Sequence, residues 1–203
     1  MSIRLQLFTA FFTLILIFII NFYINKKLSN EVIKNTSYIT NSETVIRNAN
    51  ILQKGIIEMQ SGFRGFLLTR QEVFLQLYYE GIVSVPPLFI EERSLVVPKQ
   101  KEKLDSINVL HQTWLNYSNG LIATKQDTLP EASKKYKELF ETKLRMEVGK
   151  KLNDKIQVLF LYFYDYEYQL RQERNTALQK SLNNTKEINL VLTLISIFLA
   201  VLS

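Results

Sequence analysis

The most regular pattern in this chain is an apolar residue at every third or fourth position, which is typical of helices with one buried face. One such series runs from residue 32 to residue 67, and a second runs from residue 152 to residue 177. The first contains Val32, Asn35, Ile39, Ser42, Ile46, Ala49, Gln53, Ile56, Gln60, Phe63 and Leu67. The second contains Leu152, Ile156, Leu159, Phe163, Tyr166, Leu170, Glu173 and Ala177. Both series predict long helices that pack against other helices.

Two uncharged apolar runs adjoin these series. Leu5 to Ile24 has 20 residues without a charge, about 30 Å of helix, which is enough to cross a bilayer core. Bulky and basic residues follow instead of a small-residue cleavage site, so we expect an anchor and not a signal peptide. Ile188 to Leu202 is a shorter apolar run, which we expect to be the start of a second membrane helix in a longer protein. The predicted domains are residues 1–25, 26–187 and 188–203.

The centre of the second series, VLFLYFYDYEYQL, carries apolar and aromatic residues on nearly every helical face. Such a helix needs cover on more than one side, for example from the core and from a second subunit. A strand would also fit the alternation of Val158, Phe160, Tyr162, Tyr164, Tyr166 and Tyr168. No second strand-like segment could pair with it, so we favour the helix.

Shorter helices are predicted between the two long ones. Thr69-Arg-Gln-Glu72 has the pattern of a capping box, which predicts a helix that begins near Arg70. Pro86-Pro87 should stop or kink that helix.

Two prolines mark the remaining helix starts. A third helix should begin after Pro98, and Thr128-Leu-Pro-Glu131 is a second capping box that should open the last long helix. The predicted fold class is therefore all-α, an antiparallel four-helix bundle whose two long helices continue into two transmembrane helices.

Charge and composition narrow the function. Between the apolar runs, 24 basic and 19 acidic residues give a net charge of +5, and their mixing argues against a nucleic-acid surface. The chain has no cysteine, which excludes disulfides and thiolate chemistry. His111, the only histidine, is expected on a helix flank, and Glu167 is expected as a surface charge paired with Arg171. We find no catalytic motif, and we expect no metal and no cofactor.

The segment Gln60-Ser-Gly-Phe-Arg-Gly-Phe-Leu-Leu-Thr69 is the most informative part of the chain. Gly62 and Gly65 each cost a helix about 1 kcal/mol relative to alanine, so some interaction should offset them. They could mark the end of the long helix. Alternatively, they allow a tight helix contact beside a partly buried Arg64 that needs an acceptor, such as a glutamate on the last long helix.

These residues resemble the signature of the CHASE domain of the third type, an extracytoplasmic sensory module of cyclases and histidine kinases. The matching positions are Gly62, Arg64, Gly65, Leu67, Leu68, Thr69, Glu72, Phe74 and Leu75. The segment Val97-Pro98-Lys99-Gln100 is similar to a second family pattern. Two departures stand out: Gln60 replaces a glutamate, and Arg70 replaces a glycine.

The resemblance implies that residues 26–187 are an extracytoplasmic sensor domain in a bacterial inner membrane protein. The expected parent is a two-component sensor histidine kinase, and the expected partners are the membrane, a second copy of the chain, and an unidentified ligand or protein. Gln60, Gly62, Arg64, Gly65, Thr69 and Glu72 are the candidate sensor-motif residues, expected to form a structural hinge. Two alternatives stay open: a structural two-anchor membrane protein, and the sensor of a diguanylate cyclase or chemoreceptor.

Overall fold

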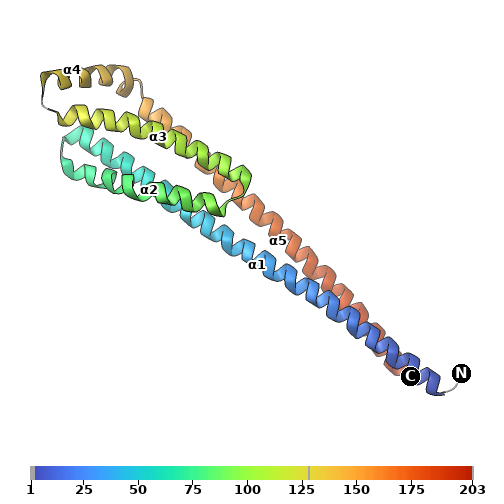
Figure 1. The fold of residues 1–203 in the computed structure, drawn as a ribbon. Coiled ribbons are helices and arrows are strands. Elements are labelled where there is room, and N and C mark those ends of the chain that lie inside the picture. Colours follow the sequence, from blue (N-terminus) through green and yellow to red (C-terminus); the bar gives the residue numbers. More distant parts are fainter. Residues whose placement is uncertain (1–2, 128, 203) are drawn as a thin grey trace. The chain divides into compact units, whose positions relative to one another are not determined.

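The described residues, 3–127 and 129–202 of a computed structural model, form helices and short connections without a strand. The helices are α1 (Ile3–Thr69), α2 (Leu75–Leu95), α3 (Pro98–Gln126), α4 (Pro130–Leu139) and α5 (Val148–Leu202). A 3-10 turn, η1 (Glu72–Phe74), precedes α2, and a π-helical turn, η2 (Phe140–Leu144), follows α4 (Figure 1). The all-α prediction is confirmed. The strand alternative is wrong, because Val158 to Tyr168 lie inside α5.

The chain divides into two compact units. The core unit is Asn41–Tyr168. The terminal unit combines Met1–Thr40 with Gln169–Ser203.

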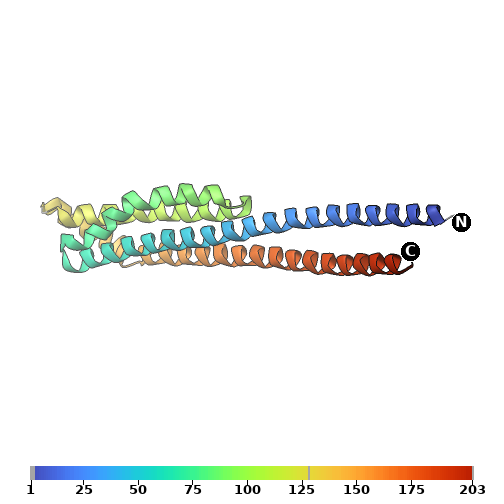
Figure 2. The same cartoon turned by 90° about the horizontal axis from the view of Figure 1, so that it is seen from below.

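One cluster of buried side chains holds the core unit together. Helices α1, α2, α3 and α5 all contribute to it, and α2 and α3 lie side by side in Figures 1 and 2. Complete burial of a large apolar side chain stabilises a fold by about 1.5–3 kcal/mol. The largest fully buried side chains are Trp114, Tyr78, Phe66, Phe160, Phe163, Leu52, Ile56, Met59, Leu75, Leu104, Ile107 and Leu121.

Helix α2 differs from the sequence prediction at both its start and its middle. It begins at Leu75, after η1, instead of near Arg70. It also continues through Pro86 and Pro87, which were predicted to stop or kink it. Each proline removes one backbone hydrogen bond, but Val85 and Phe89 on either side are buried in the core. Their burial keeps the segment helical.

The predicted last long helix is divided into two. Helix α4 begins at Pro130 with Leu129 as its N-cap, and Thr128 of the predicted capping box lies outside the described residues. After η2 the chain turns at Glu147, whose φ of 57° is left-handed, and α5 begins at Val148. The helix predicted to begin after Pro98 is present as α3, and it begins at Pro98 itself.

Two helices of the described residues are long and apolar enough to cross a membrane. One is α1, whose most apolar window is not buried at all. The other is η1 with α2, Glu72–Leu95, of which 28% is buried. Helix α2 contributes Tyr78 and Phe89 to the core cluster, so its apolar character reflects packing. The apolar end of α5 does not pass the same test within the described residues.

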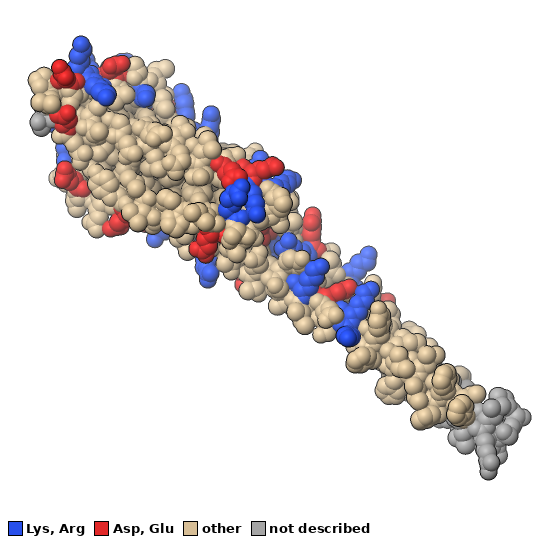
Figure 3. Space-filling model, viewed as in Figure 1, with Lys and Arg blue, Asp and Glu red and all other residues tan. Residues whose placement is uncertain are grey.

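Charged side chains are distributed unevenly over the core unit. Figure 3 shows a broad area without charges where Figure 1 places α2. Helix α2 exposes large apolar side chains there, and Val83 and Ile90 are 76% and 74% exposed.

Candidate functional site

The predicted motif occupies the last turns of α1 and the connection to η1, and its residues point in two directions. Gly62 is buried and faces the start of α2: a Cβ atom added to it would lie 2.4 Å from the Phe74 carbonyl oxygen. At Gly65 an added Cβ atom would lie 2.4 Å from the Phe74 ring. The two glycines therefore allow a close approach of the η1–α2 segment to α1.

Gln60 and Arg64 lie on another face of α1, one helical turn apart. The Gln60 side chain is 4% exposed, and its Nε2 atom has no hydrogen-bond partner. Arg64 is exposed, and its Nε donates to the Gln60 backbone oxygen at 3.3 Å. The expectation that Arg64 is partly buried and pairs with a glutamate on the last long helix is wrong, because the residue is exposed and none of the ion pairs among the described residues includes it.

Both residues line a cavity of about 430 Å³ in the core unit. The cavity lies between α1, α3 and α5, and the π-helical turn η2 contributes Leu144. Trp114 and Tyr117 of α3 form an aromatic wall, and Asn153 and Asp154 of α5 lie among the polar lining residues. The volume is in the range of small-molecule sites.

Thr69 and Glu72 do not form the predicted capping box. The Thr69 hydroxyl donates to the Gly65 oxygen at 2.8 Å and accepts from the backbone N–H of Gln71 at 3.1 Å. The Glu72 carboxylate accepts from Gln126 Nε2 at 3.4 Å. Thr69 thus caps the end of α1, whereas Glu72 contacts the end of α3.

Arg70 closes α1 in a left-handed conformation. Its φ is 60°, and its N–H donates to the Phe66 oxygen at 2.8 Å, which gives an αL helix end. Glycine is the residue that adopts this conformation most easily. The resemblance places a glycine here, and the backbone geometry gives the physical reason.

We therefore expect Arg70→Gly to stabilise the core unit by about 1 kcal/mol. Thermal unfolding of the full chain in detergent, followed by helical circular dichroism, would measure it. The matched control is Lys103→Gly, an exposed position in the interior of α3, where glycine should destabilise by about 1 kcal/mol. Equal losses of stability in both variants would contradict the geometry at Arg70.

A buried polar cluster, which the sequence did not reveal, lies near the turn between α2 and α3. Glu92 is fully buried, and neither of its carboxylate oxygens has a partner. Glu167 is also buried and accepts a hydrogen bond from Gln100 Nε2 at 2.6 Å. Burial, with the nearby charges of Glu167 and Glu91, raises the pKa of Glu92 to about 8. The expectation that Glu167 is a surface charge is wrong.

His111 is buried as well, instead of lying on a helix flank. It stacks against Trp114 with the ring centroids 6.1 Å apart, and its Nδ1 atom has no partner. Burial lowers the His111 pKa to about 4. Within the described residues no group of three or more acidic or histidine side chains is placed to hold a metal ion.

These features define an all-α domain that follows an apolar helix long enough to cross a membrane. Residues 35–177 match the CHASE3 domain. The chain therefore belongs to the CHASE3 domain family, whose members are extracytoplasmic sensory domains of signalling receptors. Neither a curated protein nor a solved structure matches the chain.

Arg64 matches the family motif, yet its exposure predicts a small effect on stability. We expect Arg64→Ala to change the free energy of unfolding by less than about 0.5 kcal/mol. Urea unfolding of the full chain in detergent would measure this change. A loss of about 3 kcal/mol would instead indicate a buried, paired guanidinium group.

Proposed function

We propose that this chain is the extracytoplasmic sensor part of a bacterial transmembrane receptor, and that the receptor is a two-component sensor histidine kinase. The match of residues 35–177 to the CHASE3 domain carries the proposal. The apolar first part of α1 supports it, because a sensor outside the cell needs a membrane segment to reach its output module.

In this proposal residues 1–25 cross the cell membrane, residues 26–187 lie outside it, and residues 188–203 begin the second crossing. The core unit works as an antiparallel four-helix bundle formed by parts of α1 and α5 with α2 and α3. The contribution of these four helices to one core cluster supports that arrangement. Because α1 and α5 also enter the terminal unit, each is a physical connection between sensor and membrane.

A second copy of the chain is the proposed partner. Helix α5 exposes Leu161 and Tyr162 by 66% and 61%, beside a face that is buried in the core. Exposed apolar side chains of this size favour association, and a two-fold dimer buries the same face of both copies. Such a dimer would give α5 the cover on two sides that its sequence requires.

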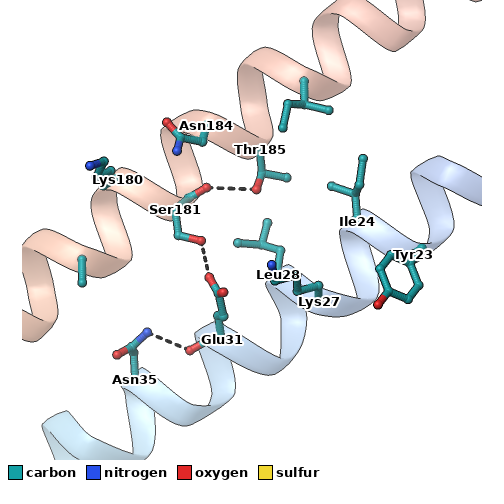
Figure 4. Close-up of a pocket in the computed structure, with 12 residues that line it drawn as sticks. Tyr23, Ile24, Lys27, Leu28, Glu31, Asn35, Lys180, Ser181, Asn184 and Thr185 are labelled. Carbon is teal, nitrogen blue, oxygen red and sulfur yellow. Dashed lines mark hydrogen bonds between the residues drawn. The ribbon is translucent and has the colours of Figure 1, made fainter.

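The proposed mechanism is a shift of α5 relative to α1 within the terminal unit. Figure 4 shows the groove between them, where the Ser181 hydroxyl donates to the Glu31 carboxylate. Two further contacts join the helices: Arg174 stacks on the Tyr38 ring at 4.3 Å, and Asn189 Nδ2 donates to Asn25 Oδ1 at 3.4 Å. Polar contacts that are only partly buried or exposed contribute little individually, so a stimulus of a few kcal/mol is enough to exchange them for another register.

Disulfide cross-linking in membranes would test this mechanism. The sequence has no cysteine, so single cysteines introduced between residues 170 and 190 report on proximity in a dimer without background. The chain would be joined to a histidine kinase core and compared in kinase-on and kinase-off variants. We expect the cross-linked positions to shift along α5 between the two states. Identical patterns in both states would overturn the mechanism, and an absence of any cross-link would overturn the dimer.

A further inference from the structure

The groove between α1 and α5 in the terminal unit begins where the two apolar runs meet the polar part of the chain. It has a volume of about 680 Å³, and residues of both helices line it (Figure 4). Tyr23 and Ile24 are the last residues of the uncharged run in α1, and Ile188 is the first residue of the apolar run in α5; all three line the groove. With these runs in the membrane, as proposed, this end of the groove lies at the hydrocarbon boundary. Lys27 then lies about 5 Å beyond Ile24 along the helix axis, which is the depth of the lipid headgroups.

The net positive charge between the apolar runs is concentrated beside them. Residues 25–40 and 169–188 together have seven basic and three acidic residues, a net charge of +4. Residues 41–168 have 17 basic and 16 acidic residues, a net charge of +1. Basic residues next to a bilayer attract anionic lipids, and each one strengthens the binding about fivefold. The segments that adjoin the membrane are therefore the part of the chain that is complementary in charge to an anionic lipid.

Two lysines of the groove are available to bind an anion. Lys27 on α1 and Lys180 on α5 both line the groove and are exposed. No ion pair among the described residues includes either of them. The lining also contains Glu31, which accepts a hydrogen bond from the Ser181 hydroxyl. The lining keeps a net positive charge, with two ammonium groups that can bind phosphate oxygens.

The membrane end of the same groove offers apolar contacts. Ile24 and Leu28 of α1 are half-buried, and Ile188 of α5 is 45% exposed. Tyr23 is 71% exposed at the same depth, and tyrosine is common at membrane surfaces because its ring contacts lipid while its hydroxyl contacts water. Apolar and basic residues in one groove fit a ligand that combines acyl chains with a phosphate, whereas a free phosphate would use the lysines alone.

We propose that this groove binds the headgroup of an anionic phospholipid from the surrounding bilayer. Lys27 and Lys180 bind the phosphate oxygens, and the acyl chains contact Ile24 and Ile188. Because the lipid contacts both helices, it adds an interaction between α1 and α5 at the place where the proposed shift occurs. The inference rests on the proposed membrane position of the chain and names a ligand for its terminal unit.

Lipid retention by the full chain in detergent tests the proposal. Phosphatidylglycerol and phosphatidylcholine would be supplied at equal concentration, and the lipid that stays bound through gel filtration would be quantified by mass spectrometry. Both lipids carry a phosphate and acyl chains, but only phosphatidylglycerol has a net negative charge. We expect a preference for phosphatidylglycerol of at least about tenfold. Equal retention of the two lipids would overturn the proposal.

A second arm separates a lipid from a free anion as the ligand. Inorganic phosphate at about 10 mM should leave the bound phosphatidylglycerol in place, because phosphate lacks the apolar contacts. Displacement of the lipid by phosphate would assign the groove to a free anion and overturn the lipid.

Two double variants separate the groove from general attraction to the membrane surface. Lys27→Gln with Lys180→Gln removes both lysines of the lining and should reduce the preference at least about tenfold. Lys26→Gln with Lys186→Gln removes the same charge from exposed positions that adjoin the membrane but do not line the groove, so the preference should be kept. Helical circular dichroism should be unchanged in both, since all four side chains are exposed. Equal losses of preference in the two variants, or no loss in the first, would overturn the assignment of the groove.

The lipid measurement is independent of the tests of receptor function. It needs neither an output module nor a defined orientation in the cell, so its failure would leave the cross-linking test unaffected. A failure of the cross-linking test would in turn leave the lipid result standing.

Discussion

Replacement of Gly62 by alanine should destabilise the core unit by about 3 kcal/mol, because the new methyl group would overlap a backbone atom. An added Cβ atom would lie 2.4 Å from the Phe74 carbonyl oxygen and 3.3 Å from the Tyr78 backbone nitrogen. Backbone atoms cannot rotate away, so the η1–α2 segment would have to move. Denaturant unfolding of the full chain in detergent, followed by helical circular dichroism, would measure the loss.

Gly120 in the interior of α3 provides the matched control. An added Cβ atom there would meet no heavy atom within 4 Å. Gly120→Ala should therefore stabilise the chain by up to about 1 kcal/mol, which is the gain in helix propensity. Gly65→Ala should fall between the two, since its nearest atoms belong to the Phe74 side chain. Stabilisation of the chain by Gly62→Ala would contradict the close helix contact.

The second large effect is a loss of stability at alkaline pH. The pKa of Glu92 is about 8 in the folded chain against an ordinary value of 4.5. Between these values the folded state holds a proton that the unfolded state has released, so stability falls as the pH rises and levels off above the folded pKa. The full loss is on the order of 5 kcal/mol. Urea unfolding at a series of pH values would measure it.

Glu92→Gln is the matched variant, because it keeps the size of the side chain and cannot ionise. Its stability should stay constant between pH 6.5 and 9, where that of the unchanged chain declines. The charged and titratable neighbours of Glu92 are Glu91 on α2 and Glu167 and Tyr164 on α5. A parallel decline in both proteins would assign the effect to one of those groups instead of Glu92.

His111 should lower the stability of the same chain at acidic pH. Its pKa is about 4 in the folded chain against 6.5 in its ordinary state. As the pH falls through this range, only the unfolded chain gains the proton, so stability decreases. Between about pH 4.5 and 6.5 the two slopes oppose each other, and we expect a broad maximum. A steady rise in stability from pH 6.5 to 9 would contradict the burial of Glu92, and a stability that keeps increasing as the pH falls from 6.5 to 4.5 would contradict the burial of His111.

Helical periodicity predicted which faces of the long helices are buried, because that spacing follows directly from helix geometry. Ala49, Ile56 and Phe63 of the first series are buried in the core, as are Ile156 and Phe163 of the second. Proline at the first turn located the start of α3 in the same direct way.

The structure departs from the predictions where tertiary contacts determine the helix boundaries and the burial of side chains. Pro86 and Pro87 stay helical because their neighbours are buried. Glu147 separates α4 from α5 in a left-handed conformation, which a glycine at that position would have predicted but a glutamate does not. Glu167 was expected as a surface charge and Glu92 carried no signal in the sequence, so only the fold shows that both are buried. The fold also places the residues of the candidate motif on two different faces of α1. The motif glycines face α2, whereas Gln60 and Arg64 face a cavity completed by residues far along the chain.

The location of the core unit outside the cell is the claim on which the sensor function depends. Lys54, whose side chain is 75% exposed on α1, and Lys134, exposed on α4, would each be changed to cysteine in the cysteine-free chain. Cells would be treated with a membrane-impermeant maleimide before and after permeabilisation. The account predicts equal labelling of both positions in intact and permeabilised cells. Labelling of either position only after permeabilisation would contradict it.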